Sequence, residues 1–281
     1  MRYGATIFAT DVSIDVVQLA VAMEERGFES LWLPEHTHIP TTRRTPWPVD
    51  ADRDLPEQYK RCLDPFVALA AAVTATSRLR VGTGIMLAAQ HEPIVTAKAV
   101  ATLDHLAGGR VSLGVGFGWN VDEMEDHGVD YATRRSHARE HVLAMRRLWE
   151  DDVAAFEGEH VSFPPTWSWP KPRQRPLPVL LGGAAGPKLF DHIAEYGQGW
   201  IPIGGRGIKD AVPVLRERVA EAGRDPSELE ITPFGSLPDH GKLDHFEAVG
   251  VTEVVFDLPS APAADVLPLL DRYAELVAER R

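Results

Sequence analysis

The sequence has a single cysteine, no long apolar run and no excess of basic residues, and each lack excludes a class of protein. Cys62 stands alone in a chain of 281 residues, so neither an internal disulfide nor a thiolate metal cluster can form. The longest apolar stretch, residues 65–75, falls far short of the ~20 residues that cross a bilayer. The first residues also lack the apolar core and cleavage site of a secretory signal. We therefore expect a cytoplasmic protein without a membrane segment.

Acidic residues dominate the charge of the chain. There are 41 Asp and Glu against 29 Lys and Arg, a formal net charge of −12 at pH 7. Because proteins bind nucleic acid largely by neutralising its phosphates with Lys and Arg, we expect no nucleic-acid partner. An anionic cofactor would have to be attracted locally, by the amides at a helix start or by side chains such as Lys188 or Arg206.

Short apolar runs alternate along the chain with longer segments of helical spacing, which is typical of successive βα units in a parallel sheet. Eight units of this kind within one chain predict an α/β protein, a (β/α)8 TIM barrel, as a single domain over residues 1–281. An open doubly wound sheet has the same periodicity, so this alternative stays open. The predicted strands are Tyr3–Phe8, Ser30–Leu33, Leu79–Ile85, Arg110–Phe117, Val179–Leu181, Gly199–Ile203, Leu229–Thr232 and Thr252–Leu258.

Helices are predicted between these strands from capping residues and from apolar side chains three to four positions apart. The first begins after Asp11 or Ser13 and ends at Gly27. An insertion loop at about residues 35–63 is too long for an ordinary connection and is predicted to be functional. Two further loops are expected at 118–133 and 162–178. The remaining predicted helices are Pro65–Thr76, Pro93–Ala107, Arg134–Trp149, Pro187–Tyr196, Ile208–Glu221, Leu243–Val249 and Ala263–Arg280.

In a (β/α)8 barrel the active site lies at the carboxyl ends of the strands, and the second strand is followed there by Glu35 and His36. A histidine titrates near neutral pH, and a neighbouring carboxylate can orient it or hold its proton. The pair is therefore a candidate for general acid–base catalysis. A local hydrogen bond from His36 that only holds the loop is the alternative interpretation.

Glycine recurs at the ends of the third, fourth and fifth strands. A flat ligand can lie against backbone that has no side chains, and the turn at 182–188 opens a helix whose amides can bind a phosphate. Together these ends predict a slot for a planar, phosphorylated cofactor, although glycine is also used where a barrel strand is crowded. The run at 114–118 lacks the G-x-G-x-x-G spacing of a dinucleotide-binding turn.

Two histidine pairs suggest a metal site, and neither meets the other requirements for one. His36 and His38 follow a strand, but no histidines stand at the fifth and sixth strand ends to complete the ligand set. His137 and His141 fit the H-x-x-E-H spacing of zinc proteases, but they lie on a strongly charged helix face. We therefore predict no metal, with a zinc hydrolase as a minor alternative.

Several of these segments together resemble the luciferase-like monooxygenase superfamily, and within it the branch of coenzyme F420-dependent oxidoreductases. The resemblance implies a (β/α)8 barrel whose cofactor ring lies across the carboxyl ends of the strands. It also implies a bulge in the third strand with a cis peptide, for which Gly84–Ile85 is the candidate. The segments that carry the resemblance are 33–36, 82–85, 97–110, 114–119 and 179–183.

The resemblance also implies roles for single residues. His36 would be catalytic, with Glu35 tuning its basicity. Trp119 stands where sugar-phosphate dehydrogenases of this branch have a glutamate, which argues against a sugar-phosphate substrate. The implied contacts with the cofactor are Gly84, Ile85, Gly116, Phe117, Gly118, Trp119 and Asn120, with Gly182, Gly183, Ala184 and Ala185 at its phosphate.

The implied function is hydride exchange between C5 of F420 and a small organic substrate, with His36 transferring the proton. FMN is the alternative cofactor, and it would permit oxygenation, which a deazaflavin does not. Arg outnumbers Lys 23 to 6, as in GC-rich genomes where F420 is common, and this favours F420. A non-catalytic cofactor-binding barrel is the third hypothesis. The insertion loop, with Trp47 and Tyr59, is expected to cover the substrate or to contact the partner in a homodimer.

Overall fold

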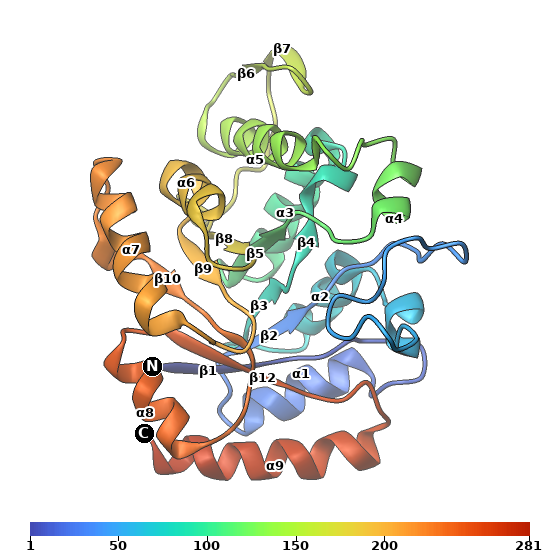
Figure 1. Cartoon of the computed structure of the whole chain (residues 1–281), viewed down its shortest axis with the longest axis vertical. Helices are drawn as coiled ribbons and strands as arrows, with labels where there is room; N and C mark the ends of the chain where they lie inside the picture. Colours follow the sequence, from blue (N-terminus) through green and yellow to red (C-terminus); the bar gives the residue numbers. More distant parts are fainter.

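The computed structural model describes all 281 residues, and its centre is a parallel sheet surrounded by helices (Figure 1). Hydrogen bonds join the strands in the order β10-β9-β8-β5-β3-β2-β1-β12-β11, with β4 paired to β5. Every pair in this order is parallel. The strands are β1 (Arg2–Thr6), β2 (Ser30–Leu33), β3 (Arg80–Thr83), β4 (Met86–Leu87), β5 (Val111–Gly116), β8 (Val179–Gly182), β9 (Gly199–Ile201), β10 (Glu230–Ile231), β11 (Phe234–Ser236) and β12 (Glu253–Asp257).

The two ends of this order, β10 and β11, are halves of one interrupted strand. β10 pairs with β9, whereas β11 pairs with β12. Hydrogen bonds from each half to the strand beside the other half close the sheet. The Thr252 amide, before β12, donates to the Ile231 carbonyl of β10 at 3.0 Å, and the Phe234 amide of β11 donates to the Pro202 carbonyl, after β9, at 2.9 Å. The sheet is therefore a closed barrel of eight strand positions, and the open-sheet alternative is excluded. The interruption includes Pro233, which has no amide hydrogen for the ladder.

The helices lie on the outside of the barrel, close to the predicted ranges (Figure 1). The predicted start of the first helix is wrong, because Asp15 caps it by accepting the amides of Val17 and Gln18. Asp11 instead pairs with Arg61. None of the helices is both long and apolar enough to cross a membrane. The bounds are α1 (Val16–Glu25), α2 (Pro65–Thr74), α3 (Pro93–Leu106), α5 (Arg134–Glu150), α6 (Pro187–Tyr196), α7 (Ile208–Glu221), α8 (His240–Ala248) and α9 (Ala263–Glu279).

Short elements occupy the connections that the sequence predicts as plain loops. The helix α4 (Val121–Asp126) follows β5, and an antiparallel hairpin, β6 (Ala154–Glu157) and β7 (Ser162–Thr166), stands beyond α5 (Figure 1). The Glu140 carboxylate of α5 holds this hairpin by accepting the amides at its turn. These elements are too short to show a hydrophobic period. Single 3-10 turns lie at η1 (Glu57–Arg61), η2 (Ala88–Gln90) and η3 (Pro226–Glu228).

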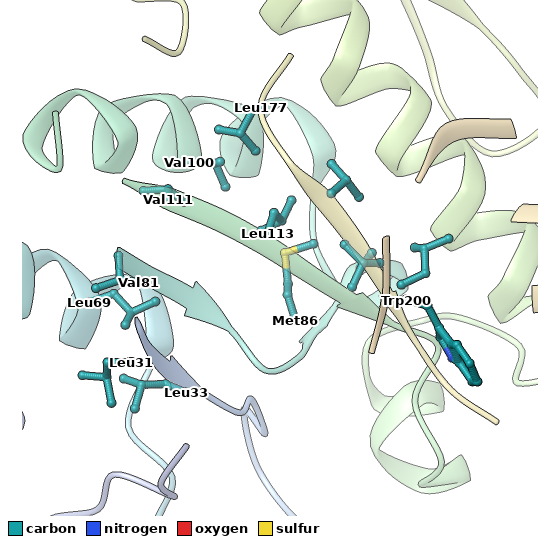
Figure 2. Close-up of a cluster of buried hydrophobic side chains, with 14 of the residues drawn as sticks. Leu31, Leu33, Leu69, Val81, Met86, Val100, Val111, Leu113, Leu177 and Trp200 are labelled. Atoms are coloured by element: carbon teal, nitrogen blue, oxygen red, sulfur yellow. The ribbon is translucent and has the colours of Figure 1, made fainter. Parts of the chain in front are cut away.

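Apolar side chains pack on both faces of the barrel strands, because successive residues of a strand point to opposite sides. In β2, Leu31 and Leu33 point outward and join the layer that Leu69 of α2 and other helical residues cover (Figure 2). Trp32 points inward, into a smaller cluster inside the barrel. The members of that inner cluster are Trp32, Leu180, Ile201, Phe234 and Val255, with Ile85 packed against them.

Candidate active site

The predicted site residues lie where the parallel strands end at one mouth of the barrel. On one side of this mouth, β5 and β8 end in glycines and Gly84 follows β3. The Gly84–Ile85 peptide is cis, as the resemblance implies. A Cβ at Gly116 would collide with the Ile85 side chain, and one at Gly84 with Phe234. The space that a side chain would take at these two glycines is therefore occupied by Ile85 and Phe234. Crowding of the barrel explains both glycines, and a cofactor contact through their backbone stays a prediction.

Glu35 and His36 do not form the expected pair. Because the alternation of β2 continues past its end, His36 lies on the inward side with Trp32, and Glu35 points outward. The Glu35 carboxylate accepts a hydrogen bond from the Leu87 amide at 2.7 Å and another from His91 Nε2 at 2.8 Å. The prediction that Glu35 tunes His36 directly is thus wrong.

The pair of Glu35 with His91 holds the strand next to the cis peptide in place. Burial lowers the pKa of His91, but the hydrogen bond and the charge of Glu35 outweigh it, so the pKa of His91 is raised above its ordinary value. The same carboxylate fixes the amide of Leu87 in β4, two residues beyond Ile85. Glu35 is therefore placed to position the bulge of the third strand.

The carboxylate beside His36 is Glu123, on the first turn of α4. Glu123 Oε2 lies 2.8 Å from His36 Nδ1, and both side chains are buried. Since a carboxylate only accepts, Nδ1 carries the hydrogen of this bond, and Nε2 is the ring nitrogen that takes no part in it. The structure records no protein partner for Nε2. His36 is thus oriented by one nitrogen and available at the other.

Buried polar atoms without a partner occur at the start of α4, the helix that carries Glu123. Glu123 Oε1 and both amide atoms of Asn120 are buried and make no hydrogen bond within the protein. A buried polar group left unpaired costs roughly 1–3 kcal/mol, so native proteins seldom leave three together. These atoms therefore indicate that a ligand or ordered water completes the site.

Aromatic side chains cover His36. The Tyr59 ring lies 5.3 Å from the His36 ring and 4.6 Å from Phe8, between centroids. Trp119 lies 5.9 Å from His36, and Trp47 Nε1 donates to the Tyr59 hydroxyl at 3.1 Å. Burial raises the pKa of Tyr59, so this phenol stays protonated at neutral pH. Both Trp47 and Tyr59 come from the predicted insertion loop, which here folds over the mouth.

The insertion loop is attached to α4 (Figure 1). Arg44 binds Asp122 through Nε at 2.6 Å and through its own amide at 2.7 Å, and it also pairs with Glu125. His38 Nε2 lies 3.1 Å from Asp126 Oδ2. One short helix thus holds His36 through its buried face and the loop through its exposed face.

The turn after β8 has fewer backbone amides without a hydrogen-bond acceptor than predicted. Gly182 lies within β8, and the Gly183 amide already donates to the Ile201 carbonyl at 3.3 Å. Ala184 and Ala185 are exposed, and their amides have no protein acceptor. The helix α6 that follows has no side-chain cap. Only the last two of the four predicted residues present free amides to a phosphate.

The histidines of the H-x-x-E-H segment make packing and hydrogen-bond contacts with the hairpin and with η2. The His137 ring stacks on His160 at 3.7 Å, and His141 Nδ1 donates to the Ala88 carbonyl at 2.8 Å. No group of three or more His, Cys, Asp or Glu side chains is arranged to hold a metal ion. The zinc alternative therefore has no ligand set.

The sequence interpretation missed Glu123 and His91. Glu123 lies in a helix of six residues that shows no hydrophobic period, and its distance from His36 along the chain hides the contact. A signal was nevertheless present, because the resemblance implies a glutamate after the fourth strand. The sequence prediction gave that position to Trp119, and Glu123 lies four positions further along the chain.

Comparison with known proteins identifies relatives along the whole chain. The family model for luciferase-like monooxygenases matches residues 8–237. An uncharacterised protein of Mycobacterium tuberculosis is 44% identical over 280 residues, 99% of this chain and 99% of the relative. An F420-dependent glucose-6-phosphate dehydrogenase of Kineococcus radiotolerans is 30% identical over 225 residues, 77% of this chain and 61% of that enzyme.

Two solved structures share the fold at low identity. The monooxygenase RslO1 from Streptomyces bottropensis has a TM-score of 0.82 and 20% identity, covering 100% of this chain and 99% of that one. An F420-dependent secondary alcohol dehydrogenase, in complex with an F420-acetone adduct, has a TM-score of 0.79 and 21% identity, covering 100% of both chains. Together with the barrel closure, these confirm the predicted fold class.

Proposed function

The chain belongs to the luciferase-like monooxygenase family, and from this membership we propose that it is an F420-dependent oxidoreductase that exchanges a hydride with a small organic substrate. The family supports an enzyme of the oxidoreductase class. The choice of F420 is supported by the dehydrogenase from Kineococcus radiotolerans, whose name states that cofactor. FMN is the cofactor against which this proposal is tested.

One observation carries the catalytic part of the proposal. His36 is buried at the mouth of the barrel, is held by Glu123 through Nδ1 and has no protein partner at Nε2. A histidine with one nitrogen fixed and the other free is the arrangement of a general acid or base. We assign the proton transfer to His36.

The residues at the mouth fit a planar, phosphorylated cofactor at two places. The unpartnered amide of Asn120 would hydrogen-bond the ring system, and the exposed amides of Ala184 and Ala185 would bind the phosphate with the positive end of α6. Lys188 and Arg206 are exposed and form no ion pair, so they can supply the attraction that a net charge of −12 does not.

When bound, F420 supplies C5 of its deazaflavin ring, a carbon that gives or takes a hydride. His36 Nε2 accepts the proton of a substrate hydroxyl in the oxidising direction and returns it in the reducing direction. Glu123 stabilises the imidazolium that this transfer creates, because its carboxylate already accepts the Nδ1 hydrogen. Tyr59 and Trp119 exclude water from the transfer by covering the ring.

Titration of the protein with F420 and with FMN, followed by cofactor fluorescence, tests the proposal. We expect F420 to bind and FMN not to bind. Asn120→Leu should weaken F420 binding about tenfold, the loss of one buried hydrogen bond to a ligand. The matched control is Gln18→Leu, which removes an exposed amide from α1.

Exclusive binding of FMN would replace the proposal by a flavin-dependent monooxygenase. Binding of neither cofactor would leave the hypothesis of a non-catalytic barrel.

A further inference from the structure

Two buried polar atoms without a partner lie outside the catalytic site, on the helices α5 and α6. They are Nη1 of Arg135, at the second position of α5, and the hydroxyl of Tyr196, the last residue of α6. The two helices contact each other outside the paired strands β5 and β8 (Figure 1). Neither atom belongs to the group around His36, so the catalytic assignment does not account for them.

A row of ring contacts connects these two groups. The guanidinium carbon of Arg135 lies 4.2 Å from the centre of the Phe117 ring. The Phe117 ring lies 5.4 Å from the His192 ring, which in turn lies 5.6 Å from the Tyr196 ring, between centroids. Phe117 directly follows β5, so the cluster begins at the mouth of the barrel. It is closed at Tyr196, which is fully buried, and open to solvent at Arg135 and His192.

The positive charge of Arg135 has no counterion in the protein. The two carboxylates of α6 on this side are engaged by other arginines: Glu195 accepts from Arg139 Nε at 2.7 Å, and Asp191 lies 3.5 Å from Arg218 Nε. Burial lowers the pKa of Arg135, but a guanidinium stays charged at neutral pH. A partly buried cation without a partner is costly in a folded protein, so this charge indicates an anion that is supplied from outside.

Hydrogen-bond donors continue from this cluster to the turn after β8. Lys188, His192 and Tyr196 follow one another at intervals of four residues and therefore share one face of α6. Lys188 is exposed in the first turn of α6, close along the chain to Ala184 and Ala185, whose amides the proposed function assigns to the cofactor phosphate. Burial lowers the pKa of His192, so its neutral ring still offers one N–H donor.

We propose that Arg135, together with Lys188 and His192, binds a carboxylate of the glutamate tail that F420 carries beyond its phosphate. The planar fork of a guanidinium matches a carboxylate with two parallel hydrogen bonds. The Tyr196 hydroxyl, whose pKa burial raises so that it keeps its hydrogen, donates to the same anion. The inference rests on the proposed function, because it adds a second anion subsite for the same cofactor. FMN ends at its phosphate, so this subsite also favours F420 over FMN.

F420 with its glutamates, and F420 that ends at the lactyl group after the phosphate, test this inference as a matched pair of ligands. Fluorescence titration of the full chain should show about tenfold tighter binding of the form with glutamates. Arg135→Met keeps an unbranched chain over Phe117 but removes the charge, so the preference should fall to about twofold or less. Arg135→Lys, which keeps the charge but not the fork, should retain part of the preference. Tyr196→Phe should lower it about threefold.

The control is Arg147→Met, which removes the same charge from the last turn of α5, where Arg147 pairs with Asp151, and should leave the preference unchanged. Because the preference is a ratio measured within one variant, a general loss of stability does not imitate the expected result. Equal binding of both forms by the unaltered protein would overturn this inference and leave the cofactor proposal standing. The same holds if Arg135→Met keeps the full preference, or weakens both forms alike, since the residue would then bind the shared phosphate. Binding of neither form would overturn both proposals.

Discussion

The polar side chains at the two ends of the barrel differ in whether they have partners within the protein. At the end where the strands begin, Arg2 Nε donates to Glu253 at 3.2 Å, and Trp32 Nε1 donates to Ser30 Oγ at 2.8 Å and to Glu253 at 3.3 Å. Ser30 also donates to Glu253, and Arg2 pairs with Glu230. Every charged side chain of this set has a partner of opposite charge or a hydrogen-bond donor.

At the end where the strands finish, the polar side chains are only partly satisfied. The side-chain amide of Asn120 has no partner, and Glu123 and His36 each use one of two polar atoms. The first end is thus completed by the protein itself, and the second is completed by something that binds. This agrees with the general division of such barrels into a stability face and an active-site face.

The largest effect on stability should come from removing the shared acceptor at the end of the barrel where the strands begin. Glu253→Ala leaves Arg2, Ser30 and Trp32 without their shared acceptor, so we expect the free energy of unfolding to fall by about 3–5 kcal/mol. Urea unfolding measures this loss, and F420 affinity of the folded protein should not change. Glu253→Gln, which keeps an acceptor, should lose less. Equal stability of Glu253→Ala and the unaltered protein would remove the contrast between the two ends.

At the end where the strands finish, truncating a polar side chain to alanine should lower activity rather than stability. His36→Ala removes the group that moves the proton, and we expect turnover of an identified substrate to fall about 100-fold or more. F420 affinity should stay nearly intact, and the free energy of unfolding should change less than in Glu253→Ala. His38→Ala, an exposed neighbour, is the control. Full activity of His36→Ala would show that the assigned role is wrong.

A smaller effect concerns how the free energy of unfolding depends on pH. At the end where the strands begin, the Glu24 carboxylate accepts hydrogen bonds from the amides of Ser77, Arg78 and Leu79, just before β3. Partial burial raises the pKa of Glu24, but these hydrogen bonds outweigh it and lower the pKa from 4.5 to about 2. A lowered carboxyl pKa contributes stability that is present above pH 4.5 and lost as the pH falls toward about 2.

Because Glu24 is largely solvated, we expect about 1–2 kcal/mol from this group. Unfolding in urea from about pH 6 to about pH 3 should show a loss that Glu24→Gln lacks. Parallel pH profiles of the two proteins would contradict this account.

The smallest effect should come from the exposed contact between the insertion loop and α4. Arg44→Ala removes ion pairs with Asp122 and Glu125 that are open to solvent, so the cost to stability should be below about 1 kcal/mol and should vanish at high salt. Proteolysis within residues 37–63 should nevertheless become faster. Arg53→Ala, an exposed arginine of the same loop without an ion pair, should leave the proteolysis rate unchanged.

The elements with a clear hydrophobic period could be predicted from the sequence alone. The bounds of α6 and α7 agree with the prediction, and β2 does as well. The interrupted seventh strand, the hairpin after α5 and the helix α4 could not be predicted, because each is only two to six residues long and is held by contacts with distant segments.

Some residues of the candidate site could likewise be predicted from the sequence, and others could not. His36 is visible in the sequence because it follows a strand at the end where such barrels bind their ligands. Its carboxylate partner is not visible, because Glu123 lies 87 positions further along the chain. The neighbour in sequence, Glu35, points to the other side of the strand and binds His91.

The class of this protein follows from its sequence: the alternation of apolar runs predicts a parallel α/β fold, and the ordered glycine, proline and histidine motifs resemble those of its family. Which side chains act together depends on the folded arrangement. Period-two alternation turns adjacent residues apart, and barrel closure brings residues from distant strands to one mouth. His36 and Glu123 therefore become neighbours only when the chain is folded.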